Sequence, residues 1–207
     1  MKIKMILVIA TLLLISLTSH RARAEDLYDY KKPRAVVDST TINLVTKQAN
    51  CANLPLVLLI GDPITAGRYS TEVSAAIKEH AYVSLLGTSK SVGDPALLDE
   101  IQLVLRQNAY SLIHFNFGMH GDVEGFRDGF SDVIATIQRH APQAKLIWAT
   151  TTPRMQRDGG ADKDVIEKNR LAADRIAKAG IAVDDLYSRV ANHPAKLWDA
   201  GGVHFMN

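Results

Sequence analysis

Four short polar stretches hold the residues of this sequence whose types could do chemistry. They combine glycines, aspartates and two histidines within a chain that is otherwise rich in apolar runs. Histidine exchanges protons near neutral pH and a carboxylate can orient it, so such a set suits acid–base chemistry on a bound molecule. The four stretches are GDPIT (61–65), SVGDP (91–95), FGMHG (117–121) and GGVHF (201–205).

Five apolar runs of strand length must position these stretches. Helical periodicities separate the runs, with Ser70 or Thr71 as a candidate N-cap of one helix and Asp94 before Pro95 at the start of the next. The runs cover 54–60, 81–86, 110–117, 144–151 and 180–187. The helical patterns cover 70–80, 94–107, 123–140 and 163–179.

Strands that alternate with helices of this length predict right-handed crossovers and a mostly parallel sheet covered on both faces. We therefore expect one three-layer α/β domain. In such sheets ligands collect beyond the carboxyl ends of the strands, so the polar stretches that follow the strands should line one site.

The first 24 residues have the pattern of a cleaved export signal. Lys2 and Lys4 precede an apolar run over 5–17, and Ala22-Arg23-Ala24 supplies small residues for a signal peptidase. A membrane anchor is the alternative, but an apolar run of roughly 13 residues is short of the roughly 20 that span a bilayer. The sequence predicts a periplasmic or secreted protein without stable membrane insertion after cleavage.

The remaining chain divides into a polar extension over 25–52 and one domain over 53–207. Removing residues 1–24 removes four of the 24 basic side chains and none of the 22 acidic ones, so the mature net charge is −2. Without a basic cluster, nucleic acid is not an expected partner. Cys51 is the sole cysteine, so it forms no intrachain disulfide; burial and pairing between chains both stay open.

The four polar stretches resemble the sequence blocks of the SGNH/GDSL hydrolases. GDPIT is similar to the first block, Gly-Asp-Ser-Ile/Leu-Thr/Ser, and SVGDP to the second, which carries a glycine. FGMHG occupies the third, Gly-x-Asn-Asp, and GGVHF ends the chain like the last, Asp-x-x-His. The blocks fall in family order and spacing over essentially all of 54–207.

This resemblance implies a flavodoxin-like sheet of about five parallel strands in 2-1-3-4-5 order, and a serine esterase acting on small acyl or carbohydrate esters. It implies His204 as the base and Gly93 as an oxyanion donor, and no cofactor or metal. It assigns supporting positions to four further residues: Gly61, Asp62, Thr65 and Gly118. The family also continues into a closing helix, whereas this sequence stops at Asn207, so we expect that helix to be missing.

Pro63 stands where the family has its nucleophilic serine. In the first turn of a helix proline is cheap, because its ring fixes a helical φ and its missing N–H has no intrahelical partner. The same residue lacks the attacking hydroxyl, whose loss costs on the order of 10⁶ in turnover, and an oxyanion donor, whose loss costs about 10²–10³. Thr65 is a poor substitute, since two helical residues rotate a side chain by roughly 200°.

Three other positions depart from the family or stay ambiguous. His120 replaces the oxyanion asparagine, where an imidazole N–H can still donate, but it could instead be a structural loop residue. Asp199 lies five residues before His204 rather than three, and either orients the imidazole or is a surface residue. His114 is expected to be a core residue, and a metal site formed with His120 is not expected.

Two functions of different class remain. The first is an exported SGNH-type ester hydrolase with impaired activity. The second is a non-catalytic relative that keeps the cleft and binds an acylated or saccharide ligand. In both, efficient hydrolysis is expected to be absent because of Pro63.

Overall fold

The computed structural model describes residues 42–46, 53–154, 162–192, 198–199 and 201–205. The predicted signal peptide over 1–24, Cys51 and the chain end at Asn207 lie outside the described residues. Six strands form one sheet in the order β1-β3-β2-β4-β5-β6. They are β1 (Ile42–Val45), β2 (Leu56–Gly61), β3 (Tyr82–Thr88), β4 (Leu112–Phe115), β5 (Lys145–Ala149) and β6 (Ala182–Asp184).

The five strands from β2 to β6 are parallel to one another, which confirms the predicted sheet and its 2-1-3-4-5 order. Strand β1 is an addition that the sequence did not predict. It pairs antiparallel with β3, with Ile42 opposite Thr88 and Val45 opposite Leu85. The extension shows no sustained period in the sequence because its strand has only four residues. Strand β1 nevertheless supplies hydrogen bonds to the edge of β3 that would otherwise be unpaired.

The predicted helices over 94–107, 123–140 and 163–179 are confirmed. Each begins after an aspartate, Asp94, Asp122 or Asp162, whose side chain accepts a backbone N–H of the first turn. The described helices are α2 (Ser70–Ala76), α3 (Pro95–Leu105), α4 (Val123–His140), α5 (Lys163–Lys178) and α6 (Leu186–Val190).

Helix α2 does not begin with a Ser70 or Thr71 cap, so that expectation was wrong. A π-helical turn, η1 (Thr65–Tyr69), runs directly into α2 and supplies its preceding backbone. The Ser70 hydroxyl instead donates to the carbonyl of Gly67 at 3.0 Å.

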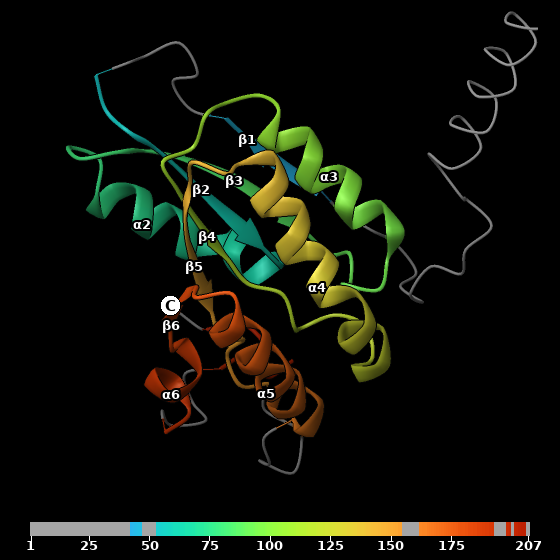
Figure 1. Cartoon of the computed structure of the whole chain (residues 1–207). Coiled ribbons are helices and arrows are strands. Elements are labelled where there is room, and N and C mark those ends of the chain that lie inside the picture. The colour runs from blue at the N-terminus through green and yellow to red at the C-terminus, as the bar shows by residue number, and fades with distance from the viewer. Residues whose placement is uncertain (1–41, 47–52, 155–161, 193–197, 200, 206–207) are drawn as a thin grey trace, which may run out of the picture. The chain divides into compact units, whose positions relative to one another are not determined.

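Helices cover both faces of the sheet, as Figure 1 shows. On one face, α3, α4 and α5 bury side chains such as Ile101, Phe130 and Ile176 against Leu58 and Ile60 of β2. On the other face, η1 and α2 pack on a smaller cluster that contains Val57 and Leu59. Successive residues of β2 therefore enter opposite cores, which explains why this strand is a continuous apolar run. Within the described residues we find no helix whose length and hydrophobicity suit a bilayer crossing.

Candidate active site

The end of β2 forms a capped turn that accommodates Pro63. The Asp62 carboxylate accepts the backbone N–H groups of Ile64 at 2.9 Å and Thr65 at 3.4 Å. The Asp62 carbonyl accepts the N–H of Ala66, a bond of helical spacing. Pro63 thus occupies the first helical position after an N-cap, where its missing N–H costs nothing, as the sequence predicted.

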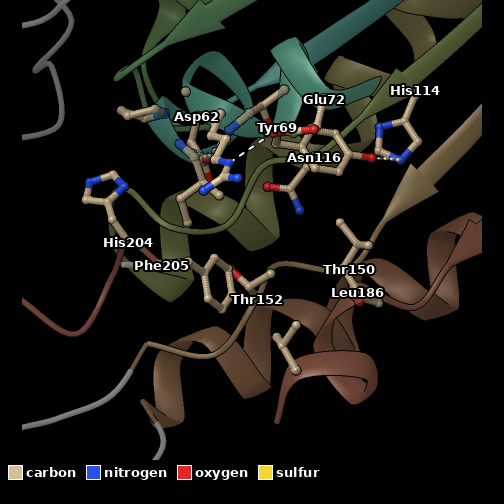
Figure 2. A pocket seen from close by; sticks show the side chains of 16 residues that line it. Asp62, Tyr69, Glu72, His114, Asn116, Thr150, Thr152, Leu186, His204 and Phe205 are labelled. Atoms are coloured by element: carbon tan, nitrogen blue, oxygen red, sulfur yellow. Dashed lines mark hydrogen bonds and ion pairs between the residues drawn. The ribbon is translucent and has the colours of Figure 1, made fainter. Parts of the chain in front are cut away.

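A cavity of about 460 Å³ opens beside this turn. Pro63 and His204 both line it, as do Asp62 and Thr65. Figure 2 shows His204 and His114 at opposite ends of the cavity, with Phe205 and Thr152 in the lower part of the view. Its volume is that of a site for a small organic molecule. Its apolar lining comes mainly from Pro63, Ile64, Leu186, Val190 and Phe205.

Asp62 is a buried carboxyl group at the wall of this cavity. The residue is 2% exposed, and its Oδ2 atom has no hydrogen-bond partner among the described residues. Burial raises the pKa of Asp62 to about 6, although the two backbone N–H groups and the charge of His204 oppose the shift. The carboxyl group therefore holds its proton in mildly acidic solution.

The turn that carries His204 is held by Asp199 and by an aromatic contact. Trp198 packs on Phe205 with ring centroids 4.4 Å apart. The Asp199 N–H donates to the His204 carbonyl at 2.8 Å. Its carboxylate accepts the N–H groups of Val203 at 3.0 Å and His204 at 3.2 Å.

Asp199 therefore binds the backbone of the His204 turn rather than the imidazole. The sequence left open whether this aspartate orients the imidazole or is a surface residue, and in the structure its carboxylate accepts hydrogen bonds from the backbone. The backbone hydrogen bonds, led by that of Val203, hold the pKa of Asp199 below its usual value. No hydrogen bond to the His204 ring occurs within the part of the chain that the structure describes, so no acid orients the predicted base there.

His120 faces a second cavity of about 460 Å³, on the other side of His204. Arg154, Asp199 and His204 also line this cavity. Burial, followed by the charges of Lys168 and Arg154, lowers the pKa of His120, so its ring is neutral near pH 7. The Nε2 atom is buried and has no partner among the described residues.

Neither His120 nor Gly93 lines the cavity that Pro63 faces, so their oxyanion roles remain predictions. Glycines of the first three blocks instead have packing reasons. A Cβ atom on Gly93 would lie 3.2 Å from the Cα of Gly125. One on Gly118 would lie within 2.5 Å of the Thr151 hydroxyl, and one on Gly61 equally close to that of Thr65. Each glycine permits a close approach between neighbouring segments.

Lys168 of α5 holds the loop that carries His120, and sequence reasoning missed it. The residue is 2% exposed, and its ammonium group donates to the carbonyls of Gly121 at 2.6 Å, Gly118 at 3.2 Å and His120 at 3.3 Å. Burial lowers the pKa of Lys168. Its position was visible in the pattern, because Lys168 falls on the buried stripe that includes Val165 and Ala172 at helical spacing.

Sequence reasoning also missed the role of His114. It is buried at 8% exposure, as expected of a core residue, yet it lines the first cavity next to Tyr69. The signal was the strand alternation, which places His114 on the same face of β4 as Asn116, another residue of the cavity wall. His114 and His120 line different cavities, and the described residues contain no group of three side chains suited to a metal ion.

The cavity thus combines two histidines, a buried carboxyl group and an apolar lining, but no serine hydroxyl stands at the end of β2. Thr65 is 5% exposed and its hydroxyl packs against Gly61. Ser70 is bonded to Gly67 and does not line the cavity. The arrangement can bind a small molecule and exchange protons with it.

Solved structures of ester hydrolases share this fold. A lipase/acylhydrolase from Enterococcus faecalis gives a TM-score of 0.56 at 21% identity, over 74% of this chain and 88% of that chain. A carbohydrate esterase family 3 protein from Talaromyces cellulolyticus gives 0.58 at 14% identity, over 74% and 89%. An acetyl xylan esterase gives 0.56 at 16% identity, over 73% and 91%.

No protein-family model matches the chain, and no curated protein matches its sequence. The likeness to solved structures is at low sequence identity and bears on the fold. On that evidence, the chain has the α/β fold of the SGNH/GDSL hydrolases.

Proposed function

We propose that this chain is an exported SGNH-type protein that binds small acyl or carbohydrate esters and hydrolyses them only slowly. The observation that carries the proposal is the place of Pro63. It lines the cavity together with His204, at the first helical position after β2, where the resemblance implies a nucleophilic serine. The cavity is present in the structure with proline at position 63.

Slow hydrolysis follows from what Pro63 lacks. Without a hydroxyl, a water molecule must attack the ester carbonyl while His204 takes its proton, and the departing alkoxide must then recover a proton. Water has to be positioned as well as deprotonated, so this route is weaker than attack by a fixed serine. Pro63 also lacks a backbone N–H to stabilise the oxyanion, and Asp199 is bonded to backbone instead of the imidazole.

The ester class is supported by the neighbours with this fold. They include an acetyl xylan esterase and a carbohydrate esterase, which act on esters by their names. The predicted signal over residues 1–24 supports export. An intact cavity beside an incomplete catalytic set also favours the second candidate, a non-catalytic protein that binds an ester or saccharide without turnover.

The decisive experiment restores the missing hydroxyl. We would express the chain from residue 25 as the parent, as Pro63→Ser and as Pro63→Ala, and assay each with 4-nitrophenyl acetate. Pro63→Ser should raise kcat/KM by roughly 10²-fold or more, because it supplies both the nucleophile and an N–H. Pro63→Ala is the matched control, since it restores the N–H alone and should gain far less.

A fluorophosphonate probe provides an independent readout. It should label Pro63→Ser at residue 63 and leave the parent unlabelled. The proposal is wrong if the parent already hydrolyses at ordinary esterase rates, or if neither form binds the ester. Binding by the parent with no turnover at all would select the non-catalytic candidate.

A further inference from the structure

At the end of the first cavity opposite His204, the lining residues Tyr69 and His114 form a cluster of three ionisable side chains with Asp184, which contacts His114 and does not line the cavity. Tyr69 comes from η1, His114 from β4 and Asp184 from the end of β6. The His114 Nε2 atom lies 3.3 Å from the Tyr69 hydroxyl and 3.3 Å from the Asp184 Oδ2 atom. Figure 2 shows the Tyr69 hydroxyl beside the His114 ring, far from His204. None of the four sequence blocks includes these residues.

The contact with Asp184 fixes where the His114 ring carries its proton. A carboxylate can only accept a hydrogen bond, so Nε2 must be the protonated nitrogen. Burial lowers the pKa of His114, against the opposing effect of Asp184, so the ring is neutral near pH 7. One N–H is then shared between the Asp184 carboxylate and the Tyr69 oxygen. The Nδ1 atom is buried and has no partner among the described residues.

Tyr69 consequently has a hydroxyl hydrogen to donate. Burial, followed by the charge of Asp184, raises the pKa of Tyr69 to about 12, so the phenol stays protonated. Because its oxygen faces the N–H of His114, its own hydrogen finds no acceptor among the residues that the structure describes. The two rings are stacked, with centroids 5.8 Å apart and an angle of 28° between their planes, which holds the phenol in place.

Two other polar groups at this end of the cavity, the Thr150 hydroxyl and the Asn116 amide nitrogen, have hydrogen-bond partners. The Thr150 hydroxyl donates to Asp185 at 3.1 Å and accepts the Tyr187 N–H at 2.7 Å. The Asn116 amide nitrogen donates to the Ala149 carbonyl at 2.8 Å and to the Thr151 hydroxyl at 3.3 Å. Leu186 and Val190 of α6 add apolar surface. Tyr69 is therefore an oriented donor whose hydrogen faces the cavity beside groups that already have partners.

We propose that Tyr69, oriented by His114 and Asp184, donates a hydrogen bond to the ligand at the end remote from the ester bond. The ligand class is an ester with an apolar or aromatic body that carries an acceptor oxygen, such as a carbonyl, at its far end. A hydrocarbon there would leave the tyrosine hydrogen unpaired in an apolar cavity, which disfavours binding. This inference rests on the proposed function, because it takes the first cavity as the ester site.

Two isosteric probes test the inference. The molecules 4-acetylphenyl acetate and 4-isopropenylphenyl acetate have the same shape. The first has a carbonyl oxygen at the position where the second has a CH₂ group. Ligand-observed NMR titration gives Kd for both with the parent, with Tyr69→Phe and with Tyr82→Phe. The Tyr82 hydroxyl donates to Asn53 and does not line the cavity, so Tyr82→Phe is the matched control.

The measured quantity is the ratio of the two dissociation constants. In Tyr69→Phe the preference for the acetyl compound should fall about three- to tenfold relative to the parent, the value of one net hydrogen bond. Tyr82→Phe should leave the ratio unchanged. His114→Leu should lower the preference in the same direction as Tyr69→Phe, because the phenol loses its positioning partner.

A second measurement needs no substitution and guards against a variant that fails to fold. In bound 4-acetylphenyl acetate, nuclear Overhauser contacts should connect the methyl group of the aryl ketone with the methyl groups of Leu186 and Val190. Binding of both probes with the same ratio in the parent and in folded Tyr69→Phe would overturn the inference and leave the proposed function intact. Failure of the parent to bind either probe would instead contradict the proposed function itself.

Discussion

Two aspartates organise the segments that carry Pro63 and His204, and in each case one carboxylate oxygen accepts two successive backbone N–H groups. Asp62 accepts the N–H groups of residues 64 and 65, and Asp199 those of residues 203 and 204. Their surroundings differ, since Asp62 is buried and Asp199 is partly exposed. The pKa of Asp62 is raised to about 6, whereas that of Asp199 is lowered.

This difference shows that backbone hydrogen bonds alone do not determine the pKa of an aspartate in a turn. In Asp199 water still solvates the carboxylate, so the N–H groups dominate and favour the ionised form. In Asp62 the loss of water outweighs two comparable bonds, because Oδ2 has no partner among the described residues to replace it. An aspartate that accepts two successive N–H groups is therefore ionised at one segment and a proton-holding group at the other.

The largest expected consequence of the burial of Asp62 is a change in how protein stability depends on pH. Comparison of the parent with Asp62→Asn measures this change. As pH rises from about 4 to 6, the unfolded chain ionises at residue 62 before the folded one, so Asp62 contributes less stability at higher pH. A shift from 3.8 to about 6 corresponds to about 3 kcal/mol. The unfolding free energy of the parent, minus that of Asp62→Asn, should fall by most of this amount between pH 3 and pH 7 in urea titrations.

Asp128→Asn serves as the matched control for that experiment. Asp128 is exposed on α4, so its replacement should leave the pH profile parallel to that of the parent. A flat difference profile for Asp62→Asn, indistinguishable from the control, would show that the Asp62 carboxyl group is not desolvated.

Asp199→Asn should change the pH dependence of stability in the direction opposite to Asp62→Asn, and by a smaller amount. The folded pKa of Asp199 is lowered, so its stabilising contribution is present above about pH 4 and is lost as pH falls through the folded value. Hydrogen exchange should show faster exchange of the Val203 and His204 amides in the variant near pH 7. The difference from the parent should close in acid. Unchanged exchange at these amides would contradict the role of Asp199 in the turn.

Much of the fold could be predicted because its signals are local. Asp94 marks a helix start by residue type, and Pro63 was correctly placed in a first helical turn by its backbone chemistry. Strand β1 was missed for the opposite reason. Its four residues carry no lasting alternation, and what defines the strand is pairing with β3, about 40 residues further along the chain.

The site was harder to predict because it depends on register and burial. Tyr69, His114 and Asp184 are far apart in sequence and meet only because β2, β4, β5 and β6 lie side by side in a fixed register. Lys168 could have been found from its helical stripe, but a lysine among charged neighbours is usually a solvent-facing residue. Block resemblance located His204 and could not reveal that Asp199 bonds to backbone.

The smallest effect concerns the interaction between the two segments. The charge of His204 lowers the pKa of Asp62, against the larger effect of burial. Replacing His204 with Gln removes that charge, so the pKa of Asp62 should rise further. The ¹³C resonance of the Asp62 carboxyl group, followed from pH 4 to pH 8, measures this shift directly.

His140→Gln is the matched control, since His140 lies at the end of α4 and does not line the cavity. A fall in the pKa of Asp62, or an equal response to both substitutions, would mean that His204 does not face Asp62 in solution. A further rise confined to His204→Gln would show that the buried carboxyl group and the predicted base share one electrostatic environment around Pro63.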